Sequence, residues 1–181
     1  ESVPSPKYQG MACIVSGRPV IVLGHAHDEP PRLAFFIAHE AGHIALGDCT
    51  AAQPVIDGND ETPDDHEIEV RADAYASAVV SGGMPIPDLS GAHWKEVANR
   101  AAAFERESGV DAGAAVWAWA TRTRRFQDGQ MALKALYRSQ GGQRVLRELF
   151  EKHVDAEAAT ETDLILLGCV SGGVERDAPA P

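Results

Sequence analysis

The sequence is poor in cysteine, in positive charge and in long apolar runs. Its 181 residues contain three cysteines, which lie far apart and form no CxxC pair. This pattern is not that of a disulfide framework, and reduced thiols are expected in a cytosolic protein. The net charge of -11 and the pI near 5.0 argue against a general nucleic-acid binder, because such proteins carry a basic face.

Membrane and secretion signals are also missing. No apolar run approaches the roughly 20 residues that a membrane helix needs. The first six residues have neither the basic region nor the apolar stretch of a signal peptide. We therefore expect a protein of the cytoplasm that does not interact with membranes or directly with nucleic acid. Hydrophobic residues make up 44% of the chain, which is enough for a packed core.

The first half of the chain is expected to combine a small sheet with two helices. Short runs rich in β-branched residues on either side of Ser16-Gly17-Arg18 predict a β-hairpin. Pro30 and Gly47 bound the first helix, and Thr62-Pro63 starts the second. The predicted segments are a loose lead-in at 1–10, a hairpin of 11–15 and 19–23, a helix at 31–46, a loop at 48–61, a helix at 64–81 and a rigid connector at 84–87.

The second half of the chain is rich in helix formers that glycines interrupt. Three tryptophans, with Phe104, Phe126 and Tyr137, are expected to form the core of this half. The fold class is therefore α+β, with a small N-terminal sheet packed on two helices and a mainly helical C-terminal half. Helices are predicted near 91–108, 112–126, 129–140, 142–153 and 161–170, before a disordered tail at 172–181.

The strongest functional signal is the segment His39-Glu40-Ala41-Gly42-His43 inside the first predicted helix. Residues four apart share a face of a helix, so the two histidines can point at one metal ion. Glu40 projects toward the same cleft, where it can contact a water on the metal. This H-E-x-x-H pattern is typical of zinc metallopeptidases. Burying these polar side chains in an apolar helix would be costly without partners.

A catalytic zinc site needs a third protein ligand, with the fourth position left for water. Cys49 occupies the position where one class of these enzymes has a third histidine, which disfavours that class. Glu69 on the second helix is the preferred candidate, and Glu67 is weaker because it lies on a different face. Asp73 lies one turn after Glu69 and can accept the ring N–H of a ligand histidine, which fixes its tautomer.

These motifs resemble those of the ImmA/IrrE family of metallopeptidases. The family's second motif reads E-x-x-A-N/D-x-F/Y-A, and here Glu69-x-x-Ala72-Asp73-x-Tyr75-Ala76 is followed by Met84-Pro85. The Glu-x-x-x-Asp spacing is also similar to that of thermolysin-like gluzincins. The resemblance covers residues 11–87. Gly82-Gly83 departs from the family's Leu-rich approach to Met-Pro, and no helix-turn-helix domain precedes the motif here.

The resemblance implies one Zn²⁺ per chain, held by His39, His43 and Glu69, with Glu40 as the catalytic base. It implies a zinc metallopeptidase domain over residues 11–87 and a role in regulated proteolysis, often of a helix-turn-helix repressor. Residues 88–171 are expected to form a helical region, to which the resemblance does not extend. Two alternatives stay open: a metal-dependent sensor that binds a transcription factor without cutting it, and a metal-stabilised structural domain.

Other polar residues have two interpretations each. His66 and His93 are candidate donors to the developing oxyanion, or surface residues; Tyr75 points elsewhere and is expected in the core. Cys49 is either a small core residue or a thiolate that occupies the open metal position. His25 and His27 belong to a loop or line the mouth of the cleft. A further cluster is a solvated helix face or a docking surface for a partner, and comprises Arg122, Arg124, Arg125, Lys134 and Arg138.

Overall fold

The computed structural model divides the chain into two compact units, residues 1–142 and 143–181, and each is considered by itself. It describes residues 10–24, 27–57, 63–91, 93–137, 141–153 and 160, without the side chains of 57 and 63–65. Residues 1–9 of the expected lead-in at 1–10, His25, Arg138, the helix at 161–170 and the tail at 172–181 lie outside the described residues. None of the described helices is long and apolar enough to cross a membrane.

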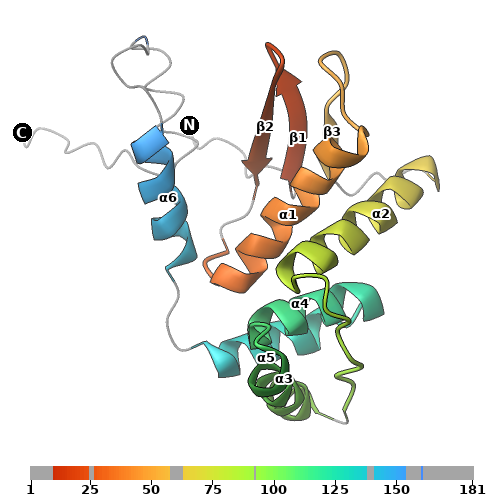
Figure 1. Ribbon diagram of the computed structural model, residues 1–181, viewed down its shortest axis with the longest axis vertical. Helices are drawn as coiled ribbons and strands as arrows, with labels where there is room; N and C mark the ends of the chain where they lie inside the picture. Colours follow the sequence, from red (N-terminus) through yellow and green to blue (C-terminus); the bar gives the residue numbers. More distant parts are fainter. Residues whose placement is uncertain are drawn as a thin grey trace, which may run out of the picture. The chain divides into compact units, whose positions relative to one another are not determined.

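A small antiparallel sheet forms the N-terminal part of the first unit (Figure 1). The predicted hairpin is present as β1 (Gly10–Val15) and β2 (Arg18–Leu23). Ser16 and Gly17 join the strands with φ of 50° and 76°, the left-handed backbone that tight hairpin turns require. β1 lies in the middle of the sheet, between β2 and a third strand.

The third strand, β3 (Val55–Asp57), corrects the prediction that residues 48–61 form a loop throughout. It pairs antiparallel with the start of β1, with Ile56 opposite Met11. Three residues are too few to show an alternating pattern, so only the pairing partner defines this strand. Gly10 is part of β1 and is buried, so the strand begins one residue earlier than expected.

The helix that carries the metal motif is α1 (Pro30–Leu46), close to its predicted range. Two prolines occupy its first turn, and it ends at Gly47, whose φ of 79° is left-handed. The chain then turns back over the last turn of the helix, where the N–H of Asp48 donates to the carbonyl of His43 at 2.9 Å. This turn fixes the position of Asp48 beside the metal motif.

α2 (Pro63–Val80) packs directly against α1, while the sheet packs on α1 (Figure 1). Small residues form the contact between the helices: Ala72 and Ala76 are fully buried on α2. A Cβ placed on Gly42 of α1 would lie only 3.3 Å from the Cα of Ala72 and 3.2 Å from the ring of Tyr75. Close approach of the two helix backbones therefore depends on the lack of a side chain at position 42.

Three helices of the C-terminal half share one core with the metal helices. They are α3 (Trp94–Ser108), α4 (Ala112–Thr123) and α5 (Phe126–Leu136). α4 is buried from Ala112 to Thr121 and packs against both α1 and α2. One core therefore contains residues of both predicted regions, 11–87 and 88–171. Its members include Phe35 and Ala38 of α1, Ala76 of α2, Val97 of α3, Trp119 of α4 and Leu133 of α5.

Helix boundaries in this half differ from the predicted ones by a few residues. α4 ends three residues early because Arg124 adopts a left-handed φ of 57°, and Phe126 then starts α5 and packs on Trp117. α3 begins after His93, whose ring nitrogen accepts from the N–H of Lys95. α6 (Gly142–His153) matches its predicted range. The α+β fold class is confirmed.

The connector between α2 and α3 is tied to α4 by side chains. Arg122 donates to the carbonyls of Ile86 and Pro87 at 3.0 and 3.2 Å. The indole N–H of Trp119 donates to Asp88 at 3.0 Å. Hydrogen bonds from Ser90 and Trp119 lower the pKa of Asp88 to about 2, so its carboxylate is charged at neutral pH. These contacts hold the predicted rigid connector against the helical core.

We expect Gly42→Leu to lower the free energy of unfolding by about 1–3 kcal/mol, because the new side chain has no room between α1 and α2. Urea denaturation followed by circular dichroism measures the change. Ala45→Leu is the matched control, since Ala45 is exposed on the same helix and should accept leucine without loss. Equal stability of the two variants would contradict close packing at Gly42.

Candidate metal centre

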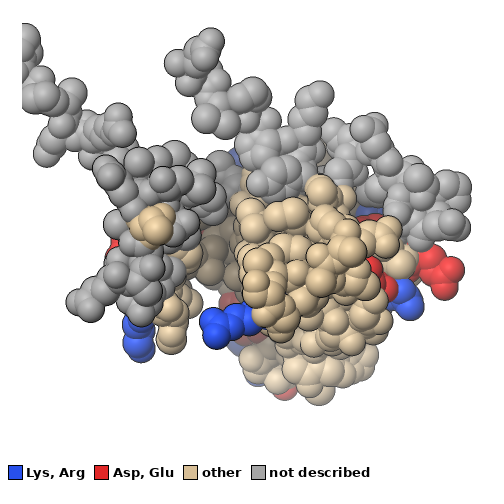
Figure 2. All heavy atoms as spheres, turned by 90° about the horizontal axis from the view of Figure 1, so that it is seen from above, with Lys and Arg blue, Asp and Glu red and all other residues tan. Residues whose placement is uncertain are grey.

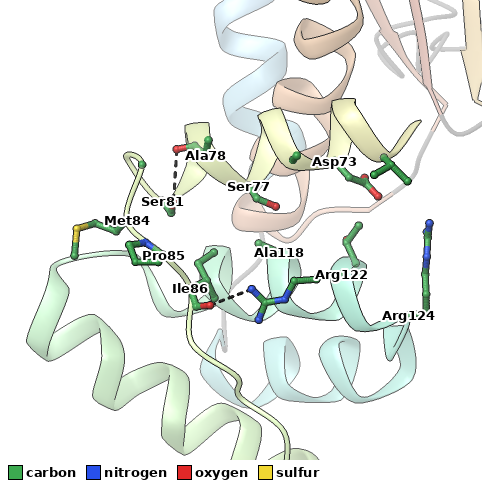
Figure 3. Close-up of a pocket in the computed structure, with 14 residues that line it drawn as sticks. Asp73, Ser77, Ala78, Ser81, Met84, Pro85, Ile86, Ala118, Arg122 and Arg124 are labelled. Atoms are coloured by element: carbon green, nitrogen blue, oxygen red, sulfur yellow. Dashed lines mark hydrogen bonds between the residues drawn. The ribbon is translucent and has the colours of Figure 1, made fainter. Parts of the chain in front are cut away.

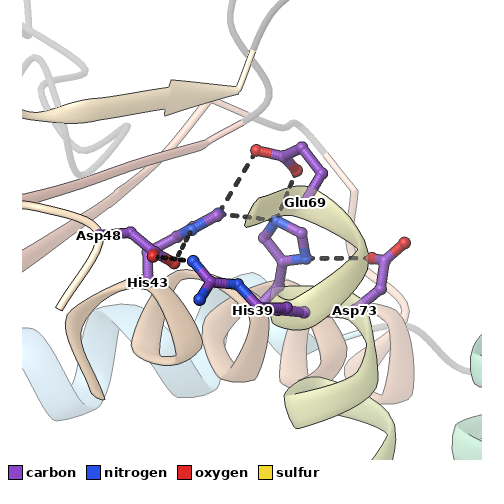
Figure 4. A network of polar contacts seen from close by, with 6 residues as sticks. His39, His43, Asp48, Glu69 and Asp73 are labelled. Atoms are coloured by element: carbon purple, nitrogen blue, oxygen red, sulfur yellow. Dashed lines mark hydrogen bonds and ion pairs between the residues drawn. The ribbon is translucent and has the colours of Figure 1, made fainter. Parts of the chain in front are cut away.

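The described residues contain one group that could hold a metal ion, formed by His39, His43 and Glu69. One ligand atom from each residue lies within 4.8 Å of the other two. Both histidines are buried, and the side chain of Glu69 is 15% exposed. α1 supplies the histidines from one face, and α2 supplies the glutamate across the close contact at Gly42 (Figure 4).

The spacing of the ligand atoms matches tetrahedral coordination. Nε2 of His39 lies 3.1 Å from Nε2 of His43 and 3.1 Å from Oε2 of Glu69. Nε2 of His43 lies 3.5 Å from Oε1 of Glu69. Metal–ligand bonds of about 2.0–2.1 Å at tetrahedral angles place ligand atoms about 3.3 Å apart. Each Nε2 is therefore at about this separation from the other Nε2 and from one of the two oxygens of the Glu69 carboxylate.

Carboxylates assign the protons of both imidazoles. Nδ1 of His39 lies 3.1 Å from Oδ1 of Asp73, and Nδ1 of His43 lies 3.2 Å from Oδ2 of Asp48. An ionised carboxylate only accepts hydrogen bonds, so each Nδ1 carries the proton in the neutral ring. Both Nε2 atoms then present lone pairs to each other and to the Glu69 carboxylate. This donor set suits a cation at the point where the lone pairs meet.

Asp48 is a site residue that the sequence analysis missed. Its side chain is 5% exposed and bonds His43 with one oxygen, while the other pairs with Arg71 of α2 at 2.5 Å. Arg71 thus offsets the charge of Asp48 and links the end of α1 to α2. A signal was present in the sequence, because a left-handed Gly47 at the helix end returns the next residue to the preceding turn.

Glu40 lies next to His39 and is 1% exposed. A Cβ placed on Gly10 would lie 1.7 Å from Oε1 of Glu40 and 2.6 Å from its carboxyl carbon. The carboxyl group of Glu40 therefore packs on the backbone of β1 at the one residue of that strand without a side chain. The sheet thereby sets the position of this carboxylate relative to the metal group.

The remaining candidates take other places. His93 caps α3 through its ring, and His66 is exposed on α2, three residues before Glu69. The oxyanion role of either histidine stays a prediction. Tyr75 packs beside Gly42. Burial raises the pKa of the Cys49 thiol, which favours a neutral core residue over a thiolate ligand.

His27 packs on the ring of Phe36, with the ring centroids 6.3 Å apart, so it supports α1 from the preceding loop.

In the predicted cluster of cations, Arg122 and Arg125 donate to backbone carbonyls of the connector and are structural. Figure 2 shows that the described surface of one face is mostly uncharged, with Lys and Arg side chains at its margin. The prediction that the chain does not bind nucleic acid remains a prediction.

Comparison of the chain with protein-family models, with curated proteins and with solved structures finds no match. The resemblance to the ImmA/IrrE family therefore depends on the sequence motifs alone.

We expect Asp48→Ala to weaken Zn²⁺ binding by about 10–100-fold, because His43 loses the acceptor that fixes its tautomer and ring orientation. Competition with a chromophoric chelator measures the affinity. Asp128→Ala is the control, since it removes a carboxylate that pairs with Arg125 instead of with a histidine. A Zn²⁺ affinity equal to that of the unmodified protein would show that Asp48 does not orient His43.

Proposed function

We propose that this protein is a zinc-dependent endopeptidase of the ImmA/IrrE type. The observation that carries the proposal is the convergence of two imidazole nitrogens and the Glu69 carboxylate at tetrahedral separations. Two imidazoles and a carboxylate are a common ligand set of catalytic zinc in peptidases. Three protein ligands leave a position open for water and substrate, whereas a structural zinc site uses four protein ligands.

Zinc bound there would supply a Lewis acid that makes water more acidic and polarises a peptide carbonyl. The chain's own residues provide the rest of the chemistry. His39, His43 and Glu69 hold the ion, and Asp73 and Asp48 keep the imidazoles oriented. The carboxylate of Glu40 accepts the proton of the attacking water and then delivers it to the nitrogen of the departing amine.

The proposed substrate is a protein, and specifically a helix-turn-helix repressor or a similar regulatory partner in the cytoplasm. This part of the proposal follows from the resemblance of residues 11–87 to the family. α4 packs directly on both metal helices, and α3 and α5 pack on α4, so this helical region is available to contribute to substrate choice. Cleavage of a repressor would convert a signal into a change of transcription.

We expect Glu40→Gln to keep one zinc per chain and to lower hydrolysis by between about 100-fold and 10,000-fold, because the general base is lost. Glu69→Ala should lose both zinc and hydrolysis. Metal content is measured by atomic emission, and hydrolysis by gel analysis of a helix-turn-helix repressor that is encoded beside the protein or co-expressed with it. Glu67→Ala, on the same helix, is the matched control and should retain both properties.

The outcomes separate the alternatives. Normal cleavage by Glu40→Gln would refute the mechanism, and full zinc affinity of Glu69→Ala would refute the ligand assignment. A zinc-loaded protein that binds the repressor without cutting it would replace the peptidase by a metal-dependent sensor.

We expect Gly10→Ala to lower hydrolysis by about 100-fold. The new methyl group would overlap the Glu40 carboxylate and push this general base out of the position that it needs for catalysis. Zinc content should stay at one ion per chain, since Gly10 is not adjacent to a ligand. Met11→Ala, one residue along the same strand, should keep its hydrolysis rate. If Gly10→Ala hydrolyses the repressor at the normal rate, the position of Glu40 does not depend on β1.

A further inference from the structure

A pocket of about 470 Å³ lies between α2, the connector and α4 (Figure 3). One wall is the second half of α2, and the opposite wall is the end of α4. The Met84-Pro85 pair, which the sequence analysis singled out as a motif, lines the pocket from the connector. Its volume lies in the range of sites that take small molecules, which is about 300–1,000 Å³.

The lining of the pocket is distinct from the metal group. Its lining includes none of the three metal-binding residues and does not include Glu40. Asp73 is the one residue that takes part in both, since it lines the pocket and also contacts Nδ1 of His39. An occupant of the pocket is therefore not the peptide bond that the metal centre would cleave.

Most of the lining is apolar and exposes hydrocarbon to solvent. Val70 and Met84 are 48% and 46% exposed, which is high for large apolar side chains. Pro85 and Ile86 extend this surface along the connector. Ala78 and Ala118 face the same space from α2 and α4, and their small side chains leave the pocket wide. An aliphatic occupant would remove this surface from water.

Positive charge lies at the α4 wall. Arg122 lines the pocket but uses its guanidinium to hold the carbonyls of Ile86 and Pro87. The guanidinium of Arg124 makes no hydrogen bond or ion pair with the described part of the chain. In Figure 3, Arg124 and Asp73 lie toward one end of the pocket, and Met84 and Pro85 lie toward the other.

Among the described residues Asp73 forms no ion pair with Arg124; its Oδ1 accepts from Nδ1 of His39. Two arginines at one pocket are notable in a chain whose net charge is -11. Arginine presents a planar fork of donors that fits a carboxylate. The positive charge of Arg124 and the apolar lining together favour a ligand that has both an anionic group and a hydrocarbon chain.

We propose that this pocket binds an aliphatic carboxylate as a ligand distinct from the substrate. The hydrocarbon chain packs on Val70, Met84 and Ile86, and the carboxylate accepts hydrogen bonds from Arg124. The site does not depend on the proposed peptidase activity, since it uses neither the metal nor its ligands.

Isothermal titration with octanoate, below its micelle concentration, tests the proposal on the full chain. Octanoate should bind at one site per chain, and amide chemical-shift changes should map to residues 70–86 and 118–124. Octylamine has the same hydrocarbon chain with the opposite charge and should bind at least about tenfold more weakly, as expected when a charge-assisted contact is lost. Metal-free and zinc-loaded protein should both bind octanoate.

Two variants locate the site. Arg124→Gln should weaken octanoate binding by about tenfold or more, whereas Arg106→Gln, which changes an exposed arginine on α3, should leave it unchanged. Ala78→Phe fills the pocket from its exposed wall and should abolish binding while the protein stays folded.

Any of three results would overturn the proposal. The first is that octanoate fails to bind the unmodified protein. The second is that octylamine binds as tightly as octanoate. The third is that folded Arg124→Gln or Ala78→Phe binds octanoate with unchanged affinity.

Discussion

Two imidazoles of α1 and a carboxylate of α2 face one another across the helix contact, and their mutual repulsion is the constraint that a bound cation relieves. The two imidazole Nε2 atoms lie 3.1 Å apart, and each lies 3.1–3.5 Å from one oxygen of the Glu69 carboxylate, at positions with little exposure to water. Lone pairs this close repel, and a cation among them replaces repulsion with attraction. Ion binding and the packing of α2 on α1 are therefore coupled, and the folded state gains stability from whatever cation it binds.

The contact between α1 and α2 also depends on small residues at the helix interface. Gly42 and Ala72 bring the two helix backbones close enough for Glu69 to reach the histidines. The buried helix α4 supports both metal helices from the other side, and the Asp48–Arg71 pair joins them at one end. The metal group thus lies within a frame that is fixed by backbone approach, by core packing and by one partly exposed ion pair. That ion pair adds little stability, because Arg71 is 47% exposed, but it holds Asp48 in place.

The sequence predicts those features that depend on the order of residues within a short segment. The hairpin, the helix with the metal motif and the α+β class follow from alternation, proline and glycine positions and apolar content, and Glu69 and Asp73 follow from the four-residue helix repeat. β3 could not be predicted, because three residues become a strand only through pairing with β1. Asp48 was missed although the helix-ending Gly47 is a local signal for the turn that returns it to His43, whereas the role of Gly10 arises from a tertiary contact with the Glu40 carboxylate. The ends of α4 and α5 depend on the left-handed Arg124 and on the packing of Phe126 on Trp117, neither of which is a local preference.

The contact between Gly10 and Glu40 makes the pairing register of the sheet part of the metal site. Successive residues of a strand point to opposite faces, so a shift of β1 by one position would place Gln9 or Met11 where the glycine now lies. β1 is paired on both sides, with Leu23 and Asp57 opposite Gly10, and these two ladders together prevent such a shift. Mutations in β2 or β3 that loosen either ladder would therefore act at a distance, by letting the strand slide beneath the buried carboxylate.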